Sequence, residues 1–296
     1  MYNNILEAIG NTPIIKINNV NPNPAVPVYA KYEGSNPTGS IKDRIALKMI
    51  EQAEIDGTLT HDKIIIEATS GNTGIGLAMI GSVKGYKVSI VMSAAVSIER
   101  QKMIRAFGGE VLLTDAKLGT DGAIMKVREL LAKEPDKYFN PNQFSNEYNK
   151  IAHYKTTAEE IWEQTEGKVT HFVSALGTSG TIMGVGLMLK ERNPDIKIIE
   201  AHPVLGHYIQ GLKNMDEAIV PAIYDPSKID ISIKVDTEES YEVARQIIAK
   251  EGIFVGMSSG AAMLAAQKVV KELESGLVVV IFADRGEKYL STGLFK

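Results

Sequence analysis

A single lysine stands at the start of a predicted helix, directly after a turn that contains proline and glycine. This lysine is Lys42, and Ser40 before it is a residue type that caps helix amino termini well. The positive end of the helix dipole disfavours a charged amine, which lowers its pKa and makes it a better nucleophile toward an aldehyde. The sequence therefore offers Lys42 as a Schiff-base residue. The alternative is a surface lysine that pairs with Asp43 or Glu33.

A dense polar loop, which we call the first anion loop, lies between a predicted strand and a predicted helix. Its residues are Thr69, Ser70, Gly71, Asn72, Thr73 and Gly74. Backbone amides at a helix start, together with hydroxyl groups, form an anion site suited to a carboxylate. Its glycines do not follow the order of the dinucleotide-binding fingerprint. A carboxylate site is therefore favoured over a nucleotide site, and an ordinary helix cap with a tight turn is the alternative.

A second anion loop follows another predicted strand and precedes another predicted helix. Its residues are Gly177, Thr178, Ser179, Gly180 and Thr181. The amides and hydroxyls of such a loop can surround a phosphate group. A generic turn between strand and helix is the alternative.

Residues 256–260 have the pattern of a nucleophile elbow, G-x-S-x-G, with Ser258 at its centre. This pattern raises the possibility of a serine hydrolase. In that fold the histidine of the catalytic triad follows the serine along the chain. All five histidines precede Ser258; they are His61, His153, His171, His202 and His207. The hydrolase hypothesis is therefore disfavoured.

Short β-branched strands alternate with amphipathic helices along the chain, and they must position these loops. The expected strands are Val28–Tyr32, Lys63–Ala68, Val88–Met92, Val111–Thr114, His171–Ala175, Lys197–Ala201 and Leu277–Phe282. The expected helices are Ile41–Glu54, Gly74–Val83, Ile98–Ala106, Asp121–Ala132, Ala152–Glu163, Ile182–Glu191, Glu238–Lys250 and Ala261–Leu273. This alternation predicts an α/β fold with two open, mostly parallel sheets flanked by helices. Ligands bind such sheets at the carboxyl ends of the strands, where these loops lie.

The composition narrows the class of protein. A chain of 296 residues has room for one large or two ordinary domains. The net charge of −4 argues against nucleic acid or an anionic membrane as a partner, and the absence of cysteine fits a cytoplasmic protein. The amino terminus lacks the layout of a signal peptide. The uncharged run Phe172–Leu189 is long enough to span a bilayer, but its central Gly, Ser and Thr residues indicate strand, loop and helix.

Taken together, the lysine and the three loops resemble those of the pyridoxal-phosphate enzymes of the cysteine synthase (O-acetylserine sulfhydrylase) family. The resemblance runs from Gly10-Asn11-Thr12-Pro13 to the carboxyl terminus, with the same order and spacing of the motifs. It implies fold type II of these enzymes, the fold of the tryptophan synthase β chain. It also implies a smaller mobile domain at residues 39–147, and a larger, phosphate-binding domain formed by residues 1–38 and 148–296.

By this resemblance, Lys42 carries pyridoxal 5′-phosphate as an internal aldimine and later acts as the base for the α-proton. Thr69, Ser70, Gly71, Asn72 and Thr73 match the substrate loop, in which Asn72 contacts the phenolic oxygen of the cofactor. Gln143 matches a second ligand of the substrate carboxylate. Gly177, Thr178, Ser179, Gly180 and Thr181 match the phosphate site, where Ser179 stands in place of a common glycine. Ser258 matches the serine on the pyridine nitrogen.

The resemblance implies synthesis of L-cysteine by β-replacement through an aminoacrylate intermediate. The alternatives are cystathionine β-synthase or serine/threonine dehydratase chemistry on the same fold, or a non-catalytic binding protein. The segment around Lys213 is similar to the branch that accepts O-phosphoserine, so Lys213 is a candidate contact for a phosphate leaving group, and O-acetylserine and O-phosphoserine both remain open. His202 stands where a glutamate is usual. The family also suggests a homodimer, with serine acetyltransferase or a sulfur-carrier protein as possible partners.

Overall fold

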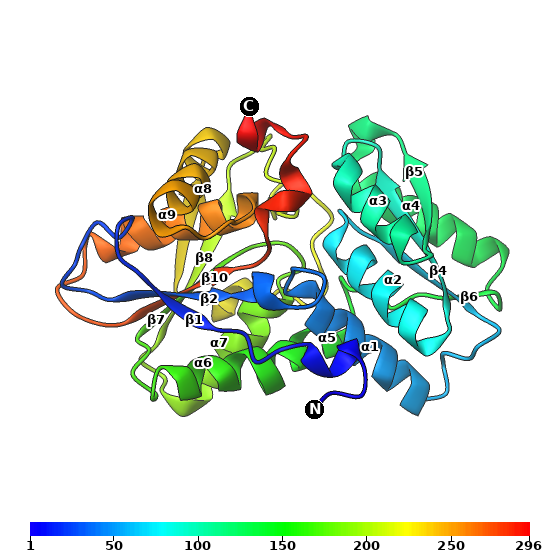
Figure 1. The fold of residues 1–296 in the computed structure, drawn as a ribbon, viewed down its shortest axis with the longest axis horizontal. Coiled ribbons are helices and arrows are strands. Elements are labelled where there is room, and N and C mark those ends of the chain that lie inside the picture. Colours follow the sequence, from blue (N-terminus) through cyan, green and yellow to red (C-terminus); the bar gives the residue numbers. More distant parts are fainter.

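The computed structural model describes residues 1–296 and contains two open sheets with helices on both faces of each (Figure 1). The larger sheet has six strands in the order β1-β2-β10-β7-β8-β9. These strands are β1 (Ile14–Ile17), β2 (Val28–Tyr32), β7 (His171–Ala175), β8 (Lys197–Pro203), β9 (Ile231–Val235) and β10 (Val278–Phe282). Strand β1 is antiparallel to β2, and all other neighbours are parallel.

The smaller sheet has four parallel strands in the order β5-β4-β3-β6. They are β3 (Ile64–Ala68), β4 (Lys87–Ser93), β5 (Glu110–Thr114) and β6 (Tyr138–Phe139). Ile65 and Ile66 on β3 point to opposite faces and both are fully buried, in two different hydrophobic clusters. The sheet is therefore covered on both sides, as parallel sheets are.

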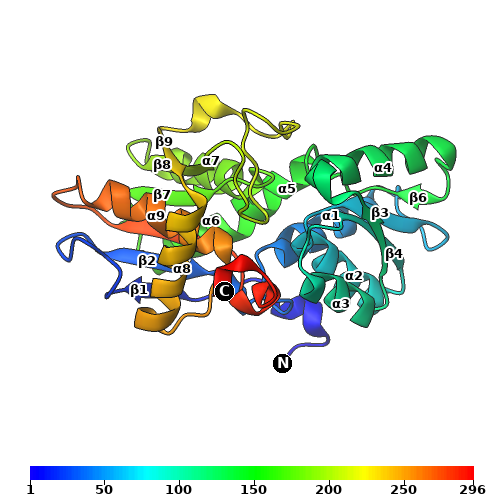
Figure 2. The same cartoon turned by 90° about the horizontal axis from the view of Figure 1, so that it is seen from above.

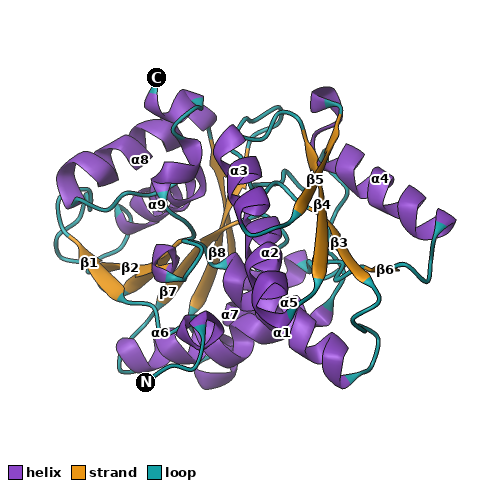
Figure 3. Ribbon diagram, turned by 45° about the vertical axis from the view of Figure 1, so that its right-hand side comes forward, coloured by secondary structure: helices purple, strands orange, loops and turns teal.

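Helices from separate parts of the chain cover the four faces (Figures 2 and 3). The smaller sheet has α2 (Asn72–Lys84) and α3 (Ile98–Ala106) on one face and α4 (Gly119–Lys133) on the other. The larger sheet has α8 (Thr237–Glu251) and α9 (Met257–Val270) on one face, and α6 (Ala158–Gln164) and α7 (Gly180–Arg192) on the other. Between the two sheets lie α1 (Lys42–Ile55) and α5 (Glu147–Ala152). The predicted α/β fold class is confirmed.

All seven predicted strands are present, and three further strands, β1, β6 and β9, were not predicted. Each of the three lies at the edge of its sheet. An edge strand is less buried than a central one, and β9 alternates between exposed and partly buried residues, so its apolar signal is weak. The predicted helix Ala152–Glu163 is divided by a π-helical stretch, His153–Thr157, that separates α5 from α6.

The uncharged run Phe172–Leu189 forms β7, a loop and most of α7, as predicted. No helix in the structure has both the length and the apolar character needed to cross a membrane. The division into domains at residues 39 and 147 stays a prediction.

Candidate active site

A cavity opens where loops of both sheets meet at the carboxyl ends of β3 and β7, and the space within it and at its open mouth together measures about 810 Å³. Eleven of the predicted site residues line it: Lys42, Thr69, Ser70, Asn72, Thr73, Gln143, Gly177, Thr178, Thr181, Lys213 and Ser258. The other three, Gly71, Ser179 and Gly180, belong to the same two loops. The folding of the chain thus brings together residues that lie more than 200 positions apart.

Lys42 is the first residue of α1, and its backbone amide donates to Ser40 Oγ at 3.1 Å. Its amine makes no hydrogen bond or ion pair, because both proposed partners are engaged elsewhere. The Asp43 carboxylate accepts bonds from the amide and hydroxyl of Thr38, and Glu33 binds Arg44 Nε at 2.7 Å. The surface ion pair is therefore excluded. Burial lowers the pKa of Lys42 to about 8, although the charge of Asp284 opposes this shift.

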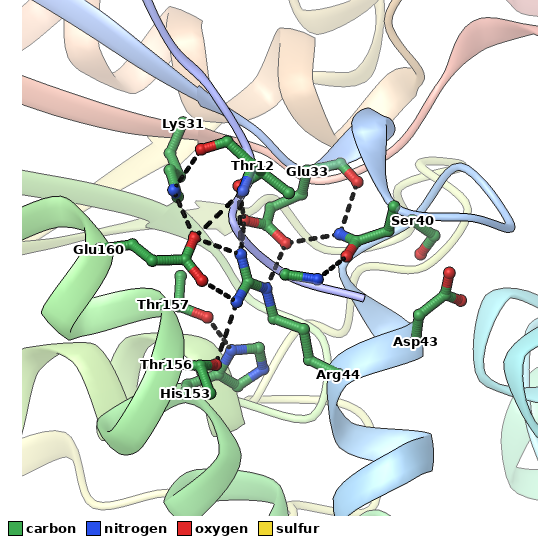
Figure 4. A network of polar contacts seen from close by, with 12 residues as sticks. Thr12, Lys31, Glu33, Ser40, Asp43, Arg44, His153, Thr156, Thr157 and Glu160 are labelled. Carbon is green, nitrogen blue, oxygen red and sulfur yellow. Dashed lines mark hydrogen bonds and ion pairs between the residues drawn. The ribbon is translucent and has the colours of Figure 1, made fainter. Parts of the chain in front are cut away.

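A buried ionic network contacts the first turn of α1 through Arg44 (Figure 4). The guanidinium of Arg44 binds Glu33 on one side and Glu160 of α6 on the other, the latter at 2.6 Å. Lys31 of β2 binds the same Glu160, also at 2.6 Å. Burial would raise the pKa of Glu160, but its bonds to both cations lower it to about 2. Because these charges are paired, they can be buried, and they hold the first turn of α1, which begins with Lys42, against α6 and the segment after β2.

The first anion loop leaves β3 and enters α2 at Asn72. Gly71 has a φ of +130°, which favours glycine, and its amide donates to Thr69 Oγ1 at 3.0 Å. The first amides of α2 have no acceptor within the helix, and the Ser70 hydroxyl makes no hydrogen bond in the protein. These free donors face a cavity, which is the arrangement that binds an anion.

Gln143 joins the first anion loop to the segment after β6. Its side chain accepts from Thr73 Oγ1 at 2.6 Å and donates to the Ala68 carbonyl at 2.8 Å. Behind it lies Glu67, whose carboxyl group accepts a hydrogen bond from the backbone amide of Gln143 at 3.3 Å. Burial raises the pKa of Glu67 to about 8, although backbone hydrogen bonds oppose the shift. A neutral carboxyl group therefore supports the loop at neutral pH.

The second anion loop leaves β7 and enters α7 at Gly180. Ser179 has a φ of +68°, the left-handed region that favours glycine, and this accounts for the glycine common at this position in the family. The Ser179 hydroxyl is buried and has no partner in the protein. A buried, unpaired hydroxyl at a helix amino terminus fits an anionic ligand such as a phosphate group.

Two residues that the sequence did not suggest hold the second anion loop from behind. Asn149 of α5 donates to Thr178 Oγ1 at 3.0 Å and to the Gln143 carbonyl at 2.7 Å, so it connects both halves of the site. His153 Nε2 lies 3.2 Å from Thr181 Oγ1, and burial lowers the pKa of His153 well below its usual value. A neutral imidazole therefore contacts this loop. An isolated Asn and an isolated His on helices gave no signal.

The carboxyl-terminal segment contributes a carboxylate that the sequence analysis also missed. Asp284 accepts from Asn72 Nδ2 at 2.7 Å and from the Tyr289 hydroxyl at 2.6 Å. This bond fixes the orientation of the Asn72 amide, whose Oδ1 is buried and unpaired. Ser258, near the start of α9, lines the cavity, and its hydroxyl has no histidine partner. The geometry thus lacks the triad that a serine hydrolase needs.

Lys213 is buried in the cavity wall. Its Nζ binds Asp121 of α4 at 2.7 Å and lies 5.2 Å from the centre of the Phe144 ring. His202 on β8 supports the same segment, because its Nε2 accepts from the Met215 amide at 3.4 Å. The histidine at this position therefore has a structural contact in this chain. Lys213 is already paired across the site, a feature that its position in the sequence did not reveal.

The sequence model of one protein family, described as pyridoxal-phosphate dependent enzymes, matches residues 5–284. The chain belongs to this family. Its cofactor is therefore pyridoxal 5′-phosphate, and the resemblance noted from the motifs is confirmed. The chemistry of the site agrees: an unpaired buried lysine, an anion loop with a free hydroxyl, and an unpaired Asn72 oxygen surround one cavity.

Relatives and solved structures, two of the three below named cysteine synthases, match the chain over nearly its whole length. A cysteine synthase of Aquifex aeolicus is 47% identical over 98% of this chain and 91% of its own length. The crystal structure of a hydrogen sulfide-producing enzyme from Fusobacterium nucleatum is 45% identical, with a TM-score of 0.94, over 98% of this chain and all of the other. A cysteine synthase structure from Entamoeba histolytica is 42% identical, with a TM-score of 0.93, over 100% of this chain and 91% of the other.

Proposed function

We propose that this enzyme synthesises L-cysteine by replacing the β-substituent of an activated L-serine with sulfide, a group-transfer reaction. The single observation that carries the proposal is the position of Lys42, an unpaired buried amine in a cavity with two separate anion loops. One loop suits a phosphate and the other a carboxylate, which are the two anions of this cofactor and an amino acid. The full-length similarity to cysteine synthases supports the choice among reactions of this fold.

The protein offers a group for each part of the cofactor. Residues 177–181 would hold the phosphate, with the free Ser179 hydroxyl as a donor. Asn72, held by Asp284, would contact the phenolic oxygen, and Ser258 would contact the pyridine nitrogen. When bound, pyridoxal 5′-phosphate supplies an electron sink for bonds at the α-carbon. A serine on the pyridine nitrogen, unlike a carboxylate, makes that sink weaker, which favours early loss of the β-substituent.

The first anion loop would hold and orient the amino acid. The Ser70 hydroxyl, the free amides of α2 and the remaining donor of Gln143 surround the place for its carboxylate. Lys42 Nζ is the group that would take the proton from the α-carbon. Its pKa of about 8 places a useful fraction of the amine in the neutral, basic form near neutral pH.

The contacts of Lys213 bear on which leaving group the enzyme prefers in its donor. The Asp121 carboxylate already neutralises this cation, so a donor whose substituent is uncharged when it binds, such as the acetyl ester that later leaves as acetate, needs no rearrangement. A phosphate leaving group would have to displace Asp121 from Lys213 before it could gain a charged contact. We therefore infer that O-acetylserine is the better donor. Asp121→Asn, which frees Lys213, is expected to improve kcat/KM for O-phosphoserine relative to O-acetylserine.

The direct experiment is to mix purified enzyme and pyridoxal 5′-phosphate with sulfide and each donor in turn, and to measure cysteine. The expected result is cysteine from O-acetylserine, with less from O-phosphoserine. Pyruvate and ammonia as the main products, with sulfide present, would instead indicate a dehydratase. A homodimer, a cytoplasmic location, and partners such as serine acetyltransferase or a sulfur-carrier protein stay predictions.

A further inference from the structure

Arg100 on α3 is a buried cation outside the set of residues discussed so far. It is only 1% exposed, and its nearest carboxylate, Asp284, lies 3.8 Å away, beyond normal hydrogen-bond distance. Its shortest hydrogen bond runs from Nη1 to Gln210 Oε1 at 2.6 Å, and the same Nη1 donates to the Ser70 carbonyl at 3.3 Å. Its guanidinium stacks on the Tyr289 ring at 4.4 Å. A buried cation needs compensating contacts of this kind.

These contacts share one property: Ser70, Gln210 and Tyr289 all line the cavity, whereas Arg100 does not. Arg100 also packs against Gly71 so closely that a β-carbon at that glycine would lie 2.4 Å from its Cδ. The side chain therefore supports the backbone of the first anion loop from outside the cavity. Through Gln210 and Tyr289, it also links this loop to two segments that come from the other half of the molecule.

We propose that Arg100 is a positioning residue that holds Ser70 and Gly71 in the conformation that binds the substrate carboxylate. This inference rests on the proposed function, because it assigns the carboxylate to this loop. A loop held by a neighbouring side chain can present its amides and hydroxyl at a fixed distance from Lys42. Small displacements of such groups cost about 100-fold in rate per ångström, so the support matters for catalysis.

An arginine is required for this role for a physical reason. Its planar group donates to two acceptors while its face stacks on an aromatic ring, and a lysine ammonium cannot do both. Arg100→Lys therefore keeps the positive charge but loses the geometry. This separates positioning from a general electrostatic attraction of the substrate, which the lysine variant would retain. Arg105, an exposed arginine on the same helix, offers the matched control Arg105→Lys.

The test compares both variants with the wild-type holoenzyme by two measurements. Steady-state kinetics with O-acetylserine is expected to show a KM about 10-fold or more higher for Arg100→Lys, with a smaller change in kcat. Hydrogen–deuterium exchange is expected to be faster in the peptide that covers residues 69–74, and unchanged elsewhere in the smaller sheet. Arg105→Lys is expected to match the wild type in both measurements.

Unchanged exchange at residues 69–74 in Arg100→Lys would overturn the proposal, and so would faster exchange throughout the protein, which would show a purely structural role. If Arg100→Lys does not fold, Gln210→Leu removes the closest acceptor of Arg100, and its exchange at residues 69–74 decides instead. A wild-type enzyme that makes no cysteine from either donor would refute the proposed function. The exchange measurement would still show whether Arg100 holds the loop.

Discussion

The two anion loops have nearly the same composition and the same place at the end of a parallel strand, yet they are held in different ways. The second loop, residues 177–181, is supported by two residues of one helical region, Asn149 and His153, which lie behind it. The first loop, residues 69–74, is supported by three separate segments of the chain, through Arg100, Gln143 and Asp284. The difference suits a cofactor that stays bound in the second loop and a substrate that binds and leaves the first loop in each turnover.

Strain is also distributed differently between the two loops. The first loop places glycine at its left-handed position, Gly71, whereas the second places Ser179 there. A non-glycine residue in that region costs about 1–2 kcal/mol of stability, so we expect the serine side chain to make a compensating interaction. Its hydroxyl is buried without a partner, which is consistent with a bond to a bound phosphate. Strain is thus accepted in the loop that would hold the cofactor.

Lys42→Ala is the change with the largest expected effect, because the ligands that the two loops would bind both react with this residue. Without its amine the enzyme has neither the covalent attachment of the cofactor nor the base for the α-proton. Cysteine formation is expected to fall by about 1,000-fold or more, which an assay of cysteine from O-acetylserine and sulfide would measure. Full turnover in this variant would remove the basis for assigning either loop.

Glu67→Gln tests the support of the first loop. The pKa of Glu67 in the folded protein is about 8, above the ordinary 4.5, so the folded state holds a proton that the unfolded state releases between these values. The stability that the folded state gains by holding this proton is fully present below about pH 4.5 and is lost as the pH rises through 8. The free energy of unfolding is expected to fall by about 1.4 kcal/mol per pH unit in this window because of Glu67 alone.

Denaturant unfolding at pH 6 and pH 8 would measure this effect. Glu67→Gln is expected to show a smaller fall than the wild type, because an amide does not titrate. The exposed Glu110, at the start of β5, provides the matched control Glu110→Gln, which is expected to behave as the wild type does. Equal slopes in all three proteins would show that Glu67 is ionised in the folded state.

A comparison of glycine and alanine at position 179 isolates the strain in the second loop. Both variants lack the hydroxyl, but only Ser179→Gly relieves the left-handed conformation at φ +68°. In the cofactor-free protein, Ser179→Gly is expected to be about 1 kcal/mol more stable than Ser179→Ala, as measured by denaturant unfolding. Equal stability of the two variants would show that the loop carries no such strain.

The sequence predicted well those features that are local in the chain. Both anion loops, Lys42 and the central strands could be identified because each has its own signal within about ten residues. The edge strands β1, β6 and β9 lacked that signal because they are short or half exposed. Domain boundaries and the roles of the individual site residues stay predictions.

The missed features are contacts between distant segments. Asp284 is 212 residues from Asn72, and Asp121 is 92 residues from Lys213. Nothing in the local sequence around these carboxylates indicates what they will meet after folding. Arg100 likewise reads as an ordinary polar residue of an amphipathic helix, and burial is the property that distinguishes it. Such partners depend on the tertiary structure and could not be inferred from one sequence.

The central claim is that one loop holds the substrate and the other the cofactor, and two matched serines test it most directly. Neither Ser70 nor Ser179 uses its hydroxyl within the protein. The measurement is the KM for O-acetylserine and the dissociation constant of pyridoxal 5′-phosphate in Ser70→Ala and in Ser179→Ala. Ser70→Ala is expected to raise the KM by up to about 10-fold and leave cofactor affinity unchanged, and Ser179→Ala is expected to do the reverse. Equal effects of both variants on both constants, or effects exchanged between them, would contradict the account.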